Sequence, residues 1–184
     1  MSVAAQKYTA VEFMELPEVQ AGAWMELVNG EVIKSPRPNM LHGYAAMKLA
    51  TMLDTHIEQH QLGVIYPELN TIFDVDEVRI PDLLFFARDR MPPKEQKYLD
   101  SIPDMCIEFL SPSNARTDRV DKFQLYQDNG VRFYWIVDPE EHTIEGYALD
   151  AGRYVSTGRA RDSQSITLPP FPDLQIPLAK LWHP

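Results

Sequence analysis

The chain has 184 residues, of which 45% are hydrophobic and 24% are charged, and it carries a formal net charge of -10. This composition is typical of a globular protein with a full buried core, which argues against global disorder, and no apolar run approaches the roughly 18–20 residues of a membrane span. The acidity argues against tight, sequence-independent DNA binding by a monomer, because such proteins usually carry a basic stripe, but it leaves room for a local basic patch or a groove in a dimer.

The first predicted elements are a short helix and a β-hairpin. Thr9 and Glu12 have the spacing of a capping box, so we expect a helix that begins after Thr9 and stops before Pro17. Apolar residues flank Asn29-Gly30, and this dipeptide readily adopts the positive φ angles of a type I′ hairpin turn. The predicted strands are at about 24–28 and 31–34.

The apolar pattern changes to a helical period between Asn39 and Gln61. The residues that share one helical face are Leu41, Ala45, Leu49, Met52, Leu53 and Ile57. We therefore expect a helix here, with Gly63 as the C′ glycine that follows it. Two β-rich segments come next, 63–75 and 77–87, and the acidic turn between them predicts an antiparallel pair.

The following part of the chain predicts a strand, a helix and a strand, in that order. Residues 88–103 are polar and contain prolines, so we expect a loop there. The predicted strands are 104–110 and 131–139, and the helix between them should end at Asn129-Gly130. This order indicates a crossover connection between two parallel strands.

The rest of the chain predicts antiparallel structure around the same sheet. The segment TIEGYALDAGRYVSTG is typical of a hairpin that turns near Ala151-Gly152, and the C-terminal segment from Leu168 should be extended and end in a short apolar turn. We find no repeat and no domain linker. We therefore expect one domain, residues 1–184, of the α/β class, with a mixed central sheet flanked by helices.

Two carboxylates lie on predicted central strands with large apolar neighbours. Asp82 follows Pro81 and precedes LLFFA, and Glu108 lies within CIEFL. Carboxylates in such surroundings are rarely fully buried unless they are paired or bind a metal. Two of them on neighbouring strands can hold Mg²⁺, which can activate a water and stabilise charge on a phosphate. Alternatively, each acid is the polar member of an alternating strand or pairs with an arginine, and composition does not decide.

The helix after Glu108 supplies a cation. Asp118 and Lys122 are four residues apart and thus share one helical face, with Tyr126 one turn further on. They could form a solvated ion pair of little energetic value. They could also place Lys122 over the C-terminal end of the Glu108 strand, where a lysine can polarise a phosphate or orient an attacking water. The spacing alone does not choose between these interpretations.

Other chemistries find little support. His56 and His60 are four residues apart but do not form the zinc-protease pattern, so we expect both at the surface. No nucleophile-elbow motif is present, and the serine-proline-serine segment 111–113 is better interpreted as a helix N-cap. The lone Cys106 cannot form an internal disulfide or a zinc site by itself, and the N-terminus lacks the pattern of a secretion signal. We therefore expect a cytoplasmic location and no membrane partner.

Taken in order, several segments resemble the Uma-type family of restriction endonucleases, part of the PD-(D/E)-x-K nuclease superfamily. The segments are MELVNGEVI, His42, RIPDLLFF, IEFLSPSN, DRVDKFQLY and GVRFYWIVDP, and the resemblance extends from Phe13 to Leu181. It implies a restriction-endonuclease-like core. It also implies a metal-dependent endonuclease that hydrolyses the phosphodiester bonds of nucleic acid, with DNA as the expected partner.

The resemblance further implies roles for single residues. Asp82 matches the aspartate of the PD motif and Glu108 matches the acid of the (D/E)-x-K motif, both as ligands of Mg²⁺ or Mn²⁺. Leu110 stands where the superfamily has lysine, and Lys122 matches the helix lysine that replaces it in the Uma-type family. Glu26 matches an early glutamate that completes the metal shell or acts as a base.

The role of His42 stays open at this point, and so does the choice between an active nuclease and an inactive module. His42 matches a histidine at a helix start, where it would contact phosphate or water, or else cap or pack the helix. A nuclease that cuts both strands of a duplex needs two sites, so we expect a homodimer. The alternative is a catalytically inactive member that keeps the fold as a binding or assembly module, which the net charge of -10 and Leu110 favour.

Overall fold

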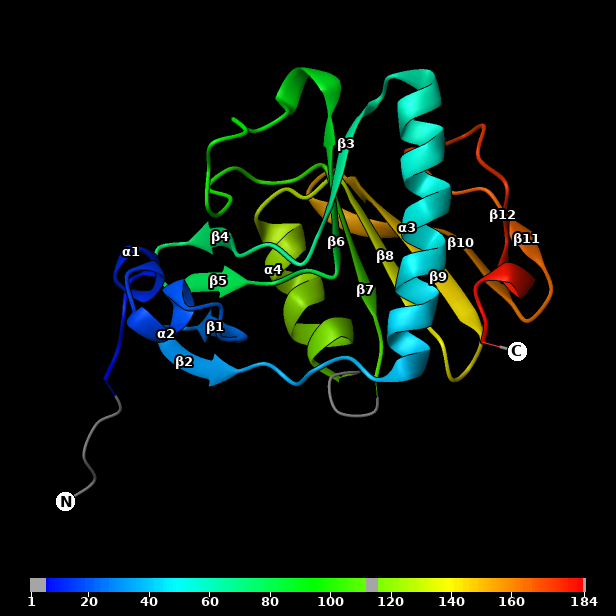
Figure 1. Cartoon of the computed structure of the whole chain (residues 1–184). Coiled ribbons are helices and arrows are strands. Elements are labelled where there is room, and N and C mark those ends of the chain that lie inside the picture. Colours follow the sequence, from blue (N-terminus) through cyan, green and yellow to red (C-terminus); the bar gives the residue numbers. More distant parts are fainter. Residues whose placement is uncertain (1–5, 112–115, 184) are drawn as a thin grey trace.

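The central feature of the molecule is a six-stranded mixed sheet (Figure 1), seen in a computed structural model that describes residues 6–111 and 116–183. Its strand order is β10-β9-β8-β7-β6-β3. The strands are β3 (Gly63–Pro67), β6 (Leu83–Ala87), β7 (Met105–Phe109), β8 (Phe133–Asp138), β9 (Thr143–Asp150) and β10 (Arg153–Arg161). Only β7 and β8 are parallel neighbours in this sheet, while the other pairs are antiparallel. The predicted α/β class with a mixed central sheet is confirmed.

A second, antiparallel sheet lies beside the first and was not predicted as a separate unit. Its order is β2-β1-β5-β4. The strands are β1 (Met25–Val28), β2 (Glu31–Lys34), β4 (Thr71–Asp74) and β5 (Glu77–Arg79). The segments 63–75 and 77–87 do pair antiparallel, but each divides between the two sheets. Glu68, whose φ is 47°, interrupts the first segment, and Pro81, which has no amide hydrogen to donate, interrupts the second.

The predicted turns are confirmed where two successive residues need positive φ. Asn29 and Gly30 connect β1 to β2 with φ angles of 50° and 77°, and Ala151 and Gly152 connect β9 to β10 with 46° and 80°. Gly130, with φ of 74°, follows the helix between β7 and β8. The two hairpin turns match the twist of their flanking strands, which fixes the register of each hairpin.

The N-terminal helix begins as predicted, at a complete capping box. The Thr9 side chain accepts from the Glu12 amide and the Glu12 side chain accepts from the Thr9 amide, and α1 (Ala10–Met14) follows. A second short helix, α2 (Pro17–Gln20), was not predicted. Pro17 occupies its first position, where a missing amide hydrogen costs nothing.

The long helix α3 (Met40–His60) corrects two details of the prediction. Gln61, with φ of 53°, takes the left-handed position at its end, so Gly63 is not the C′ residue. Gly63 begins β3 instead, where an added Cβ would lie 1.9 Å from the carbonyl oxygen of Phe86. His56 is buried rather than at the surface, because it packs edge-on against Phe171 of the C-terminal segment.

The connection from β7 to β8 is helical, as predicted, but begins as a π-helix. It consists of η2 (Thr117–Lys122), which is a π-helix, and α4 (Phe123–Asp128). Pro112 and Ser113 of the predicted serine cap lie outside the described residues. The predicted loop 88–103 is irregular apart from the 3-10 turn η1 (Arg88–Arg90) and one parallel β-bridge between Leu99 and Thr71.

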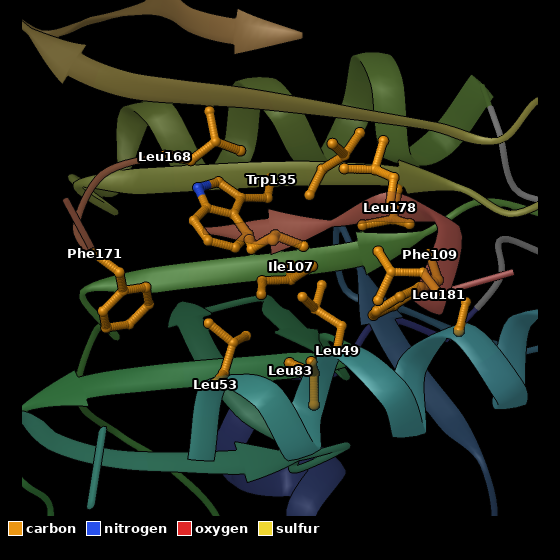
Figure 2. Close-up of a cluster of buried hydrophobic side chains, with 14 of the residues drawn as sticks. Leu49, Leu53, Leu83, Ile107, Phe109, Trp135, Leu168, Phe171, Leu178 and Leu181 are labelled. Atoms are coloured by element: carbon orange, nitrogen blue, oxygen red, sulfur yellow. The ribbon is translucent and has the colours of Figure 1, made fainter. Parts of the chain in front are cut away.

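The two faces of the central sheet are covered by different helices. Ile107, Phe109 and Trp135 pack against α3 on one face (Figure 2). Cys106, Tyr134 and the α4 residue Tyr126 belong to the cluster on the other face. Because successive side chains of a strand alternate between faces, the Glu108 side chain of β7 points to the same side as Cys106, toward η2 and α4.

The C-terminal segment completes the core on the α3 side. It forms β11 (Ser165–Ile166), β12 (Ile176–Pro177) and the turn η3 (Leu178–Lys180). Phe171, Leu178 and Leu181 from this segment lie buried among residues of α3 and the sheet (Figure 2). The predicted apolar turn is therefore an integral part of the core. Among the residues described, no helix combines the length and the apolar character that crossing a membrane would require.

Candidate active site

A pocket of about 290 Å³ lies where the two sheets meet, beside η2 and the start of α3. It receives residues from β1, β2, the β5–β6 junction, β7, η2 and α3. The five candidate residues all line it, and they are Glu26, His42, Asp82, Glu108 and Lys122. Residues more than 90 positions apart in the sequence thus share one cavity, although their roles in it stay predictions.

Glu108 projects from β7 into the buried end of this pocket. Its side chain is 0% exposed, and both of its carboxylate oxygens have partners. Oε2 accepts from the Lys122 ammonium at 2.9 Å, and Oε1 accepts from the Tyr126 hydroxyl at 2.6 Å. Burial raises the pKa of Glu108 well above its usual value, and the nearby Lys122 opposes that rise. Glu108 is therefore not a stray polar residue of a strand, because two side chains of the following helix meet it.

Lys122 places its ammonium among three carboxylates. Nζ lies 2.9 Å from Glu108 Oε2, 3.2 Å from Asp118 Oδ1 and 3.9 Å from Glu26 Oε1. Burial alone would lower the pKa of Lys122, but these carboxylates outweigh it and hold the pKa well above its usual value. The ammonium is thus fully charged at neutral pH. Leu110, two residues after Glu108, is buried in the apolar cluster on the α4 side.

Asp118 belongs to the same cluster, and the sequence-based selection of site residues left it out. It is 0% exposed and lines the pocket, and neither of its carboxylate oxygens accepts a hydrogen bond of good geometry from a described residue, although Lys122 Nζ lies 3.2 Å from Oδ1. Burial raises the pKa of Asp118 to about 6, although Lys122 opposes the rise. The four-residue spacing to Lys122 was the available signal. Both residues lie on the π-helix η2, a rare helix type that frequently marks functional sites.

The pKa of Asp118 predicts a specific pH dependence of stability. Between its ordinary value of 3.8 and about 6, the folded protein holds a proton on Asp118 that the unfolded chain has released. The stability from this group is therefore fully present below pH 3.8 and is lost as the pH rises through 6, by up to about 3 kcal/mol. Urea unfolding from pH 4 to pH 8 should show that Asp118→Asn gains stability relative to the parent over this range.

The neighbouring acid Asp121 provides the control for that experiment. It lines the same pocket from the same π-helix but is exposed to solvent. Asp121→Asn should therefore follow the parent across the whole pH range. Parallel curves for Asp118→Asn and the parent would contradict the prediction.

Asp82 lies at the junction where the chain passes from the four-stranded to the six-stranded sheet. Its Oδ2 accepts from the backbone N–H of Phe109 at 2.7 Å, which ties the junction to the end of β7. Its Oδ1 lies 3.2 Å from His42 Nε2, although Nε2 forms no hydrogen bond of good geometry with any described group. The contact between these two side chains is thus electrostatic.

His42 is buried on the first turn of α3 and does not cap it. The helix cap is Asn39, whose side chain accepts from the His42 amide at 2.9 Å. Burial lowers the pKa of His42, but the adjacent Asp82 carboxylate outweighs it, so the pKa is raised overall. The imidazole thus faces the pocket beside a carboxylate and holds a proton more readily than a free histidine.

Glu26 connects the edge of the site to the second sheet. It lies on β1, is 9% exposed, and its Oε1 accepts from the backbone N–H of Ile80 at 2.8 Å. Ile80 immediately precedes Pro81 and Asp82, so this bond helps to fix the junction that carries Asp82. The β1–β2 hairpin therefore positions Glu26 and also supports a second candidate acid.

The types of side chain in the pocket fit a hard divalent cation. Carboxylate oxygens are the ligands that Mg²⁺ and Mn²⁺ prefer, and the buried oxygens of Asp118, which accept no hydrogen bond of good geometry among the described residues, are acceptors that a cation would satisfy. The spacing, however, is not that of a formed site, since no group of three or more His, Cys, Asp or Glu among residues 6–111 and 116–183 is arranged to hold a metal. In this arrangement the Lys122 ammonium provides the positive charge that compensates Glu26, Glu108 and Asp118.

Comparison with known proteins identifies one family and one solved fold. The family described as "Uma2: Putative restriction endonuclease" matches residues 10–179. The uncharacterized protein sll1609 of Synechocystis sp. (strain ATCC 27184 / PCC 6803 / Kazusa) is 25% identical over 150 residues, which cover 80% of this chain and 84% of that protein. A crystal structure from Anabaena variabilis ATCC 29413, described as a putative nuclease belonging to DUF820, superimposes with a TM-score of 0.79 at 23% identity, covering 94% of this chain and 96% of the other. The likeness to the Anabaena variabilis structure shows the fold of this chain.

Proposed function

The chain belongs to the Uma2 restriction-endonuclease family, and from that premise we propose that it is a metal-dependent endonuclease that hydrolyses phosphodiester bonds of DNA. The observation that carries the proposal is the Lys122 ammonium, which lies 2.9 Å from Glu108 inside a pocket that also receives Asp82. A buried cation beside strand carboxylates is suited to hold a phosphate and to stabilise the charge that develops on it.

The proposed metal ligands are Asp82, Glu108 and Glu26. A bound Mg²⁺ or Mn²⁺ would act as a Lewis acid on the scissile phosphate and lower the pKa of a bound water. Lys122, charged at neutral pH, would donate a hydrogen bond to a phosphate oxygen or orient the attacking water. Glu26 either completes the ligand set or accepts the proton of that water at its carboxylate.

His42 is proposed to contact the phosphate from the α3 side. Its raised pKa favours the imidazolium, which can donate from Nε2 to a phosphate oxygen. The capping alternative is left aside because Asn39 caps the helix. The low effective dielectric of the buried pocket strengthens each of these charge interactions.

Cleavage of both strands of a duplex would require two copies of this site. We therefore propose a homodimer as the active form. The second candidate function is a catalytically inactive binding or assembly module. One observation favours it, namely that the carboxylates among the described residues are not arranged as a formed metal site.

Incubation of the purified protein with DNA and RNA tests the proposal directly. Supercoiled and linear DNA and single-stranded RNA would each be combined with Mg²⁺ or Mn²⁺. We expect DNA cleavage with either ion and none in EDTA, because the ion supplies the activated water. Calorimetric titration with each ion separates the two candidates. Failure to cut any substrate, together with no ion binding, would favour the binding module.

A further inference from the structure

The segment 32–53 is unusual in this acidic protein. The chain contains 27 Asp and Glu residues, yet none lies between Glu31 and Asp54. The same segment contains Lys34, Arg37 and Lys48. It forms most of β2, the connection to α3 and the larger part of that helix. A local excess of positive charge is therefore concentrated in one continuous stretch of the fold.

Part of this stretch forms the rim of the candidate active site. The pocket lining includes every residue from Ile33 to Pro38, and the side chains of Lys34 and Arg37 are exposed to solvent. The buried end of the same pocket contains Glu108, Asp118 and Lys122. The pocket thus has a basic rim above a predominantly acidic floor.

The Arg37 side chain is held in place at this rim. Its guanidinium carbon lies 4.6 Å from the centre of the Trp24 ring, and Trp24 lines the pocket as well. Pro36 and Pro38 flank Arg37, which restricts the backbone on both sides. A guanidinium stacked on an indole keeps its N–H edge available for a planar, bidentate contact with phosphate. Arg37 is therefore oriented before any ligand arrives.

The two rim cations form no close ion pair within the described part of the chain, although the charge of Arg37 opposes the rise that burial causes in the pKa of Glu68. Among the described residues, no carboxylate lies within ion-pair distance of Lys34 or Arg37. Arg79 lines the same pocket but differs, because its Nε and Nη2 contact Glu77 Oε2 at 3.0 and 2.7 Å. Arg79 thus has a structural partner, whereas Lys34 and Arg37 line the pocket without a close ion pair to any described carboxylate.

We propose that Lys34 and Arg37 bind the phosphates next to the scissile phosphate on the strand being cut. This inference rests on the proposed function and names the surface that holds its substrate. The contacts are to the phosphate backbone, so they position the strand without reading its sequence. They also reconcile binding of a polyanion with the net charge of -10, because the positive charge is local to the pocket rim.

The first test measures oligonucleotide binding without cleavage. Fluorescence anisotropy of a labelled DNA oligonucleotide in EDTA, from 50 to 200 mM salt, would compare the parent with Arg37→Gln and Lys34→Gln. We expect each variant to bind the oligonucleotide about tenfold more weakly than the parent, whatever its sequence. The slope of log K against log salt should be smaller by about one in each variant. The matched control is Arg153→Gln, since Arg153 is an exposed cation of β10 that does not line this pocket.

A second readout uses the tryptophan beneath Arg37. Trp135 and Trp182 are buried at 0% and 9% exposure, whereas Trp24 is half-buried at the pocket rim. Oligonucleotide binding should change the emission of Trp24, because a phosphate and Arg37 meet at the face of its ring. In Trp24→Phe the emission change should disappear while anisotropy still reports binding. Persistence of the emission change in that variant would place the nucleic acid elsewhere.

The outcomes separate this inference from the proposed nuclease function. If the parent cuts and binds DNA, and both rim variants bind with its affinity and salt slope, the inference is wrong while the nuclease function stands. If binding depends on Arg37 but no metal supports cleavage, the rim is confirmed as a phosphate-binding surface, while the nuclease function and the placement beside a scissile phosphate both fail. If no oligonucleotide binds the parent in the anisotropy assay, the rim does not hold nucleic acid and the inference is overturned.

Discussion

Replacement of Lys122 by methionine is expected to lower the cleavage rate by about 10²–10³-fold. Methionine keeps much of the length of the side chain but removes the ammonium, which lies 2.9 Å from Glu108 in the parent. A preorganised donor to the developing charge of a transition state is worth about this factor when it is removed. Single-turnover cleavage with excess enzyme measures the chemical step, so weaker substrate binding would not imitate the effect.

The same substitution should also destabilise the fold, by about 3–5 kcal/mol. Glu108, Asp118 and Glu26 would lose the cation that lies within 2.9–3.9 Å of each of them. Urea unfolding at pH 8 measures the loss. At pH 5 the loss should be smaller, because the raised pKa values of Glu108 and Asp118 allow both groups to take up protons in the folded state.

A double variant distinguishes the loss of an ion pair from simple loss of packing. Lys122→Met combined with Glu108→Gln removes both charges, and the introduced amide oxygen could still accept from Tyr126, the partner of Glu108 in the parent. We expect this variant to regain the part of the stability that the unpaired Glu108 charge costs, while Asp118 and Glu26 stay without the cation, and to show no cleavage. Equal instability of the single and double variants at pH 8 would show that packing rather than charge governs the effect.

Local sequence patterns predicted the elements that depend on local interactions. Asn29-Gly30 and Ala151-Gly152 specify their turns through the φ angles that two residues must adopt, and Thr9 specifies a cap through one side chain. The division of the β-rich segments between two sheets was missed, because it depends on how the sheets pack and not on the residues of either segment alone. For the same reason His56, polar and at the end of a helix, gave no sign that Phe171 would cover it.

The sequence predicts a candidate site residue where a charged side chain stands among apolar neighbours. Glu108 stood out as an acid within an apolar strand, and resemblance to a family connected it with Lys122. The burial of Asp118 beside Lys122 could not be foreseen, since the spacing of these two residues is equally that of a solvated surface pair. The contact of Arg37 with Trp24 joins the start of a hairpin with the loop that follows it, which only the folded chain reveals.

Asp82→Asn is expected to lower cleavage by about 10³-fold and to weaken Mg²⁺ or Mn²⁺ binding by about tenfold or more. The amide oxygen can still accept from the Phe109 N–H, as Asp82 Oδ2 does at 2.7 Å, so the fold should lose only about 1 kcal/mol or less. Cleavage kinetics, calorimetry with each ion and urea unfolding measure the three quantities separately. A variant that binds the ion as tightly as the parent would remove Asp82 from the proposed ligand set.

Asp104 offers a matched control, because it is a buried acid beside the same strand with a purely structural set of partners. It is 1% exposed, accepts from the Ala87 amide at 2.7 Å and pairs with Arg90 and Arg132. Asp104→Asn should therefore cost stability, by about 1.5–3 kcal/mol, since the charge-assisted hydrogen bonds from two half-exposed arginines are lost. Its cleavage rate per folded molecule and its ion affinity should remain those of the parent. The opposite effects of two similar substitutions would assign catalysis to the pocket carboxylates rather than to buried acids in general.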